Sequence, residues 1–331
     1  MPTLDADRIS RELVRHLRGK RAQQALGRKL GFGSNVVHTW ESGRRAPEVT
    51  QFFRLAELCG VAVSPAIAGF FKDPPPELRR ARLASPRGVQ HLVTALVGST
   101  VRAHVAERIG IDRTTLARWL AGKTGPRLPE LLRLVEVTTQ RLLPFVELFA
   151  DPRALESTRA AYEDLAAQQR LAYDLPWSHA LLRALELAEY AALAQHRPGF
   201  LAARLGITRG EEELYLEALA AAGQIRWTGT HWVLQRVLTV DTRTDAARDR
   251  ALKAHWARTA LERLEHASAR EEALFSYNLF AVSEESFQRI RQLHLDYYDA
   301  VRALVDESTH ADRVVLMNAQ LVPLEAAARR R

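Results

Sequence analysis

The chain contains an internal repeat. Residues 22–47 align without a gap with residues 101–126, 79 positions later in the chain. The matched positions include Trp40/Trp119, Gly43/Gly122 and Pro47/Pro126. The match extends outward to residues 13–70 and 92–149, which we call copy one and copy two. Because self-similarity at a fixed spacing indicates a repeated structural unit, we expect two similarly folded copies.

The positive charge of the chain is concentrated in the part that holds the repeat. The 331 residues carry a formal net charge of +8. Residues 1–150 contain 24 Lys and Arg against 13 Asp and Glu, a balance of +11. Residues 151–331 contain 23 against 26, a balance of −3. This asymmetry predicts a polyanionic partner for the N-terminal half.

Composition limits the class of protein. A hydrophobic fraction of 47% and a charged fraction of 26% are typical of a globular chain. No apolar run approaches the ~18 residues that a membrane span needs, and the N-terminus lacks a signal pattern. We therefore expect a cytoplasmic protein with no membrane partner. The single cysteine, Cys59, excludes an internal disulfide and a thiolate zinc cluster, and we expect no metal and no cofactor.

Each copy contains the residues that a helix-turn-helix requires. Gly31 and Gly110 lie where the chain leaves the predicted second helix, a position that favours a left-handed residue. Trp40 and Trp119 fall on the apolar face of the predicted third helix, and we expect both in the core. Asp112 precedes the third helix of copy two and is predicted to cap it. Each copy is thus predicted to be a five-helix domain built around a helix-turn-helix.

Copy one resembles the Cro/phage-repressor (Xre-type) helix-turn-helix family. The resemblance rests on Gln23, the turn residue Gly31 and the sequence WESGRRAP over residues 40–47. Copy two departs from this pattern, since Leu120 stands where copy one has Glu41, and Arg102 where it has Gln23. The resemblance of copy two therefore rests on the internal repeat. It implies that both copies bind double-stranded DNA.

The family resemblance also predicts which residues contact DNA, because its third helix lies in the major groove. Carried over by position, the base-contacting residues are Ser34, Asn35, His38 and Thr39 in copy one and Arg113, Thr114, Ala117 and Arg118 in copy two. Asn35 is expected to bind adenine, and Arg113 or Arg118 to bind guanine. The residues expected to contact phosphates are Gln23, Arg44, Arg45, Arg102, Lys123 and Arg127. The alternative is that one copy serves only as a packing partner for the other.

Residues 152–240 are predicted to form a connecting helix and a winged-helix-like unit. Helices are expected over residues 177–195, 200–205 and 210–222, and alternation around Gly229 predicts a β-hairpin over 225–234. Three consecutive carboxylates, Glu211 to Glu213, open the third helix and would be repelled by DNA phosphates. We therefore predict a scaffold or subunit-interface role for this unit.

Residues 250–325 are predicted to form a small α+β domain. Strands are expected over 278–282 and 313–323, on either side of a helix over 284–305 that Ser283 caps. Residues 275–324 resemble the C-terminal domain of a bacterial family of uncharacterised function with N-terminal helix-turn-helix units. The complete chain is predicted to be mainly α, with helix-turn-helix domains over 1–73 and 77–151.

These features predict a sequence-specific transcriptional regulator that binds double-stranded DNA through two helix-turn-helix units. The C-terminal half is expected to support dimerisation, sensing of a small-molecule effector, or contact with another protein. No enzymatic activity is expected, because the C-terminal histidines lack metal-ligand spacing and no phosphate loop or nucleophile elbow is present. The alternative is a protein-interaction module of the antitoxin or immunity type, in which DNA binding is secondary.

Overall fold

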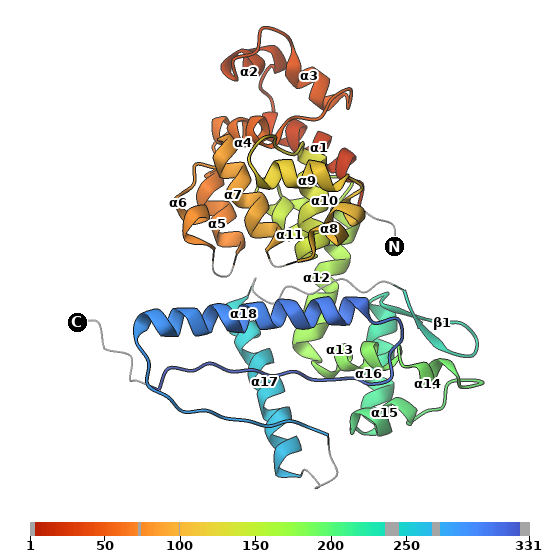
Figure 1. Ribbon diagram of the computed structural model, residues 1–331. Coiled ribbons are helices and arrows are strands. Elements are labelled where there is room, and N and C mark those ends of the chain that lie inside the picture. Colours follow the sequence, from red (N-terminus) through yellow and green to blue (C-terminus); the bar gives the residue numbers. More distant parts are fainter. Residues whose placement is uncertain (1–3, 72–73, 99, 236–244, 267–271, 325–331) are drawn as a thin grey trace. The chain divides into compact units, whose positions relative to one another are not determined.

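The chain consists of two compact, largely helical units, residues 1–166 and residues 167–331. A computed structural model describes residues 4–71, 74–98, 100–235, 245–266 and 272–324 (Figure 1). Within these ranges the only sheet has two strands. None of the described helices is by itself long and apolar enough to cross a membrane, and one bent pair, Val49–Leu58 with Val63–Phe70, passes that test together.

Five helices lie within each copy of the repeat. Copy one forms α1 (Ala6–Arg18), α2 (Gln23–Lys29), α3 (Val36–Glu41), α4 (Val49–Leu58) and α5 (Val63–Phe70). Copy two forms α7 (Pro86–Val97), α8 (Arg102–Ile109), α9 (Arg113–Leu120), α10 (Leu128–Thr139) and α11 (Leu142–Glu147). The short helix α6 (Pro76–Arg80) lies between them in the chain.

The first helix of each copy shows why these segments are helical. Asp5 caps α1 by accepting hydrogen bonds from the amides of Asp7 and Arg8, each at 3.0 Å. Leu13 and Leu17 follow Ile9 at helical spacing, and all three are buried. Ser85 caps α7 in the same way, by accepting from the amide of Gly88 at 3.1 Å.

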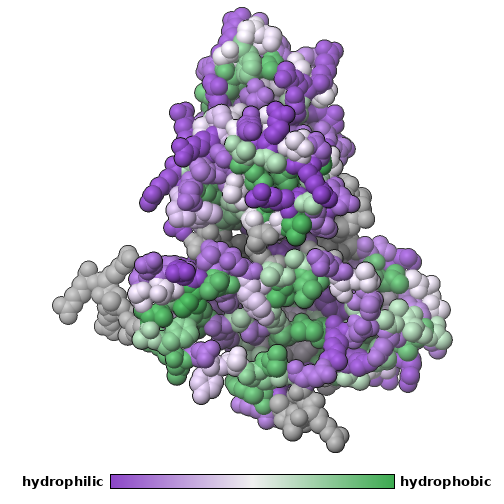
Figure 2. Space-filling model, viewed as in Figure 1, coloured by the Kyte–Doolittle hydropathy of each residue, from purple (hydrophilic) through white to green (hydrophobic). Residues whose placement is uncertain are grey.

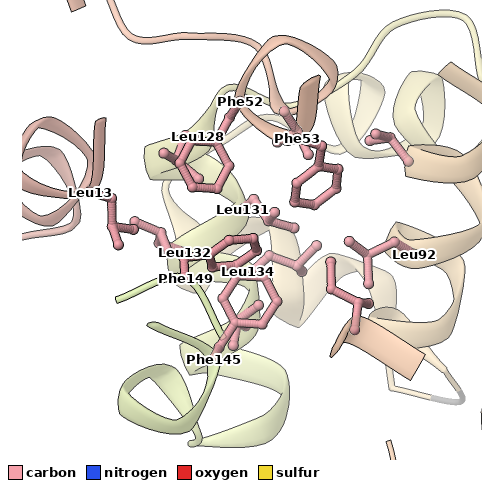
Figure 3. Close-up of a cluster of buried hydrophobic side chains, with 14 of the residues drawn as sticks. Leu13, Phe52, Phe53, Leu92, Leu128, Leu131, Leu132, Leu134, Phe145 and Phe149 are labelled. Atoms are coloured by element: carbon pink, nitrogen blue, oxygen red, sulfur yellow. The ribbon is translucent and has the colours of Figure 1, made fainter. Parts of the chain in front are cut away.

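The two copies share one hydrophobic core (Figure 3). The ring of Phe149, which follows α11, contacts Phe52 and Phe53 of α4, with centroid separations of 5.0 and 6.1 Å. Leu13 of copy one and Leu132 of copy two are fully buried in the same cluster. Each buried side chain of this size contributes roughly 1.5–3 kcal/mol. Separating the copies would therefore expose apolar surface on both.

Equivalent segments of the two copies bond to each other reciprocally. The amide of Val49 donates to the carbonyl of Pro126 at 3.1 Å, and the amide of Leu128 donates to the carbonyl of Pro47 at 2.9 Å. Glu48 and Arg127, which occupy equivalent positions, form an antiparallel bridge between these bonds. Helix α4 also packs on its equivalent α10, and α5 on α11. Such reciprocal contacts indicate an approximate local two-fold axis between the copies.

The C-terminal unit is built around a second core. After the 3-10 helix Pro152–Ala154 and helix α12 (Arg159–Asp174), it contains α13 (Trp177–Ala184), α14 (Ala188–Ala191), α15 (Phe200–Leu205), α16 (Arg209–Ala221), β1 (Ile225–Trp227), β2 (Trp232–Leu234), α17 (Ala246–Glu265) and α18 (Glu284–Glu307). The predicted hairpin is present, with Trp227 opposite Trp232 in an antiparallel register. Leu181, Leu201 and Leu219 are fully buried between α13, α15 and α16.

The structure corrects two predictions for this unit. The helix expected over residues 177–195 is broken, because Leu187 adopts an extended conformation and the amide of Ala188 donates to the carbonyl of Ala311 at 2.8 Å. Residues 278–282 and 313–323 are not strands. A strand needs a neighbouring strand for its amides and carbonyls, and the described residues give the C-terminal segment a single bridge, Leu187 to Ala311. The prediction of an α+β domain over 250–325 is therefore wrong.

Candidate nucleic-acid interface

The turn between the second and third helices has the predicted geometry in both copies. Gly31 has a φ of 90° and Gly110 a φ of 76°. Residues other than glycine rarely adopt these left-handed φ values. In each copy the turn is followed by the helix that the family resemblance places in the major groove. These helices are α3 in copy one and α9 in copy two.

Helices α3 and α9 begin at different positions of the repeat. Asp112 caps α9, accepting from the amide of Thr115 at 2.7 Å, as predicted. The hydroxyl and amide of Thr115 hold the pKa of this carboxyl below its usual value. Copy one has Gly33 at the equivalent position, and glycine has no side chain to cap a helix. Asn35 takes this role instead, accepting from the amide of His38 at 3.3 Å, so α3 starts two positions later.

The predicted base-contacting side chains lie on the outside of the N-terminal unit. Asn35 is exposed, but its side-chain oxygen Oδ1 accepts the hydrogen bond of the helix cap. Its side-chain NH₂ group is therefore the donor that remains for a base. Thr39 is half-buried, and its hydroxyl donates to the carbonyl of Asn35 at 3.4 Å. The other predicted base contacts are exposed: Ser34, His38, Arg113, Thr114, Ala117 and Arg118. No described residue pairs with the guanidinium of Arg113 or Arg118.

Gln23 is held by a buried carboxylate. Its amide nitrogen donates to Oε2 of Glu41 at 2.7 Å. Arg18 donates to the same carboxylate, with Nε 2.5 Å from Oε1 and Nη2 3.2 Å from Oε2. This bidentate bond raises the pKa of Arg18. Glu41 is buried, so the Glu of the WESGRRAP signature anchors α3 to α1 and α2. The side-chain amide of Gln23 is bound to Glu41 and is not free in solvent.

Copy two replaces this polar network with apolar contacts. Val97 and Leu120 stand where copy one has Arg18 and Glu41. Val97 is buried and Leu120 packs against the same core. Arg102, the equivalent of Gln23, is consequently left exposed at the start of α8, and no described residue pairs with its side chain. The paired change at positions 18/97 and 41/120 is visible in the repeat alignment and could have identified Arg18 as the missing partner of Glu41.

Arg127 has a structural partner. Its Nη1 donates to the carbonyl of Ala46 at 3.0 Å, across the reciprocal contact between the copies. The prediction that Arg127 is a phosphate contact did not take account of this bond, because the two residues lie 81 positions apart. Arg44, Arg45 and Lys123 are exposed, and their side chains pair with no residue in the described ranges.

The three glutamates of the winged-helix-like unit do not act as one negative patch. Glu212 is fully buried and accepts hydrogen bonds from the amides of Gly199 and Ala202, at 3.0 and 2.6 Å. It therefore stabilises the start of α15. Glu211 accepts from the amide of Thr208 at 2.7 Å in a capping box, and Glu213 pairs with Arg209 at 2.9 Å. The expectation of three carboxylates aimed at one surface is wrong, and the role of this unit stays a prediction.

Comparisons with known proteins match two parts of the chain. A helix-turn-helix family model matches residues 103–139, within copy two, and indicates a DNA-binding regulator. The resemblance that we drew from sequence is strongest in copy one, so the tandem arrangement remains a prediction. No curated protein and no solved structure shows significant similarity to the chain. A second family model matches residues 157–324, a larger region than the 275–324 in which we saw a resemblance. Because this match spans about half of the chain, the protein belongs to the family described as "Domain of unknown function (DUF4423)".

Proposed function

We propose that this protein is a sequence-specific transcriptional regulator that reads double-stranded DNA with both copies of the repeat. The observation that carries the proposal is the pair of equivalent helices, α3 and α9, each preceded by a left-handed glycine turn. All of the predicted base-contacting side chains except the half-buried Thr39 are exposed. Arginine contacts guanine through two parallel hydrogen bonds. Arg113 and Arg118 are suited to that contact, because their side chains are exposed and pair with none of the described residues.

Backbone binding is assigned to the cations around these helices that have no partner in the described part of the chain. Arg44 and Arg45 follow α3, and Lys123 follows α9. Arg102 begins α8, where amides and the helix dipole favour a phosphate. Since each neutralised phosphate releases counterions, we expect affinity to fall steeply as salt rises. The exposed side chains of these four residues are the ones available for that role.

The reciprocal bonding between the copies suggests how the half-sites are oriented. A two-fold relation between two DNA-reading units matches half-sites in inverted orientation, about one helical turn apart. The base-contacting residues differ at every equivalent pair, for example Ser34 against Arg113 and Thr39 against Arg118. We therefore propose an inverted site with dissimilar halves, bound by a single chain.

The C-terminal unit is proposed to join two chains. Of the twenty large apolar side chains that are exposed in the described part of the chain, fourteen lie between Leu274 and Leu324. Figure 2 shows apolar side chains, in green, at the surface of this unit. Patches of this kind are typical of interaction surfaces. A second copy of the chain is the proposed partner, and a cytosolic location without enzymatic activity completes the proposal.

Selection of bound duplexes from a random pool tests the proposed function. With the full-length protein, we expect enriched duplexes to contain two unlike half-sites in inverted orientation, with centres about 10 base pairs apart. Enrichment of one half-site alone would show that one copy does not read bases. Absence of any enriched sequence, together with a flat dependence of affinity on salt, would overturn the proposal.

A further inference from the structure

The C-terminal unit contains a cavity to which the features above assign no ligand. Its volume is about 520 Å³, within the range of small-molecule sites. Helices α13, α15 and α17 form its walls together with the segment 314–316. The lining side chains that matter for its chemistry are Trp177, His179, Arg183, Arg204, Trp256 and Arg263.

The charged lining of the cavity is cationic. Among the described residues, three arginines line it and no acidic side chain does. Arg183 pairs with Glu186 at 3.0 Å, and Arg204 pairs with Glu189, so each is held by a carboxylate outside the lining. A guanidinium has five N–H donors, and a single carboxylate partner leaves donors available. These donors are suited to a carboxylate, sulfonate or phosphate group.

Arg263 is fixed in a different way. Its Nη2 donates to the carbonyl of Leu205 at 2.7 Å, at the last turn of α15. The guanidinium lies against Gly206, where an added Cβ would be 2.7 Å from the same nitrogen. A cation at a helix C-terminus is favourable, so Arg263 has a structural role as well as a place in the cavity wall. Replacing Arg263 would therefore disturb the end of α15 as well as the cavity.

Apart from His179 and Thr259, the remaining lining is apolar and aromatic. The rings of Trp177 and Trp256 meet at a centroid separation of 5.3 Å and an interplanar angle of 66°. Leu205, Val314 and Leu316 complete this part of the wall. Burial lowers the pKa of His179, so its imidazole is neutral near pH 7 and leaves the positive charge to the arginines. The cavity thus combines a surface for an aromatic body with a cationic rim.

We propose that this cavity binds a small organic anion whose body is aromatic or otherwise apolar. Arg183 and Arg204 bind the anionic group, and Trp177 and Trp256 contact the body. Such a site would let the C-terminal half sense a small-molecule effector, as the sequence predicts for a regulator. To that extent the inference rests on the proposed function. Because its wall includes the segment 314–316 as well as three helices, an occupied site would hold that segment against them.

The test compares two probes that differ in charge, 1-naphthaleneacetate and the neutral 1-naphthaleneacetamide. Each is titrated into the full-length protein without DNA, by calorimetry. We expect one naphthaleneacetate per chain, with affinity at least about tenfold above that of the amide, since guanidinium groups donate stronger hydrogen bonds to a carboxylate than to a neutral amide. No binding of naphthaleneacetate, or equal affinity for both probes, would overturn the proposal.

Variants locate the site and separate the two proposals. In the double variant Arg183→Gln with Arg204→Gln, the affinity for naphthaleneacetate should fall to that for naphthaleneacetamide, while retained binding of naphthaleneacetamide shows that the cavity is intact. Arg183→Lys in place of Arg183→Gln should restore part of the difference in affinity between the two probes. Arg226→Gln, on the exposed face of β1, should leave both affinities unchanged. An unchanged acetate affinity in the double variant would exclude this cavity as the site. DNA affinity is measured separately, so loss of one activity without the other identifies which proposal fails.

Discussion

The two copies of the repeat keep one fold with different chemistry. In copy one, a buried carboxylate, Glu41, holds Arg18 and Gln23. In copy two the equivalent pair is Val97 and Leu120, and the residue equivalent to Gln23 is an exposed arginine, Arg102. Replacing a buried ion pair by apolar residues is often neutral or stabilising. Loss of the signature Glu therefore need not indicate loss of the fold. In copy two it leaves the side chain of Arg102 exposed at the surface.

The packing of the second helix differs between the copies as well. Helix α8 packs against both α9 and α10, whereas the principal partner of α2 is α3. Copy one compensates with the polar network at Glu41, which joins α1, α2 and α3. The following predictions test how far the two copies depend on each other and how unequal they are.

The largest effect is expected from removing the core tryptophans. Trp40→Ala and Trp119→Ala should each lower the free energy of unfolding by about 3–5 kcal/mol, because both side chains are buried. Since the copies share one core, each variant should shift a single unfolding transition of the N-terminal unit. Denaturant unfolding followed by circular dichroism checks this. A variant that unfolds only one copy, seen as a transition split in two, would show that the copies are independent.

The next largest effect is expected at the polar network of copy one. Glu41→Leu alone should destabilise the protein by about 2 kcal/mol, because it leaves the partly buried Arg18 without its carboxylate. Arg18→Val combined with Glu41→Leu installs the pair of copy two, and should recover most of that loss. The free energy of unfolding of the single and double variants measures the coupling. If the losses simply add, the apolar pair is not an equivalent solution.

A smaller effect is expected at the DNA-reading faces. Arg113→Ser places the residue of copy one in copy two, and should change base preference at one half-site by about 1–3 kcal/mol. Asn35→Ser keeps a capping residue in copy one and should alter the other half-site without loss of stability. Binding to duplexes with single base changes measures both. Should Arg113→Ser weaken binding equally for all duplexes, Arg113 contacts phosphates rather than bases.

The smallest effect is expected at the start of α8. Arg102→Gln installs the residue of copy one and should reduce the slope of log affinity against log salt by about 0.9, the value for one phosphate. The control is Arg127→Gln, which removes a bond to the carbonyl of Ala46. It should lower stability and leave the slope unchanged. A slope that changes with Arg127 and not with Arg102 would reverse these assignments.

Local sequence features predicted the elements that depend on neighbouring residues. The glycine turns at Gly31 and Gly110, the cap at Asp112 and the hairpin over residues 225–234 all arise from interactions within a few positions. The roles of Gln23 and Arg127 were harder to predict, because their partners lie 18 and 81 positions away. Residues 313–323 alternate as a strand does, but alternation does not supply a strand to pair with.

The shared core also affects how DNA occupancy depends on protein concentration. Two separate domains must associate before both half-sites are filled, so occupancy at low concentration rises with the square of the protein concentration. Here copy two is joined to copy one by the covalent chain and by the packed rings of Phe52, Phe53 and Phe149, so its effective concentration beside copy one is high. A single chain can therefore fill such a site in proportion to its concentration. Joining two chains through the C-terminal unit would then bring further half-sites together, and would not be needed to fill one such site.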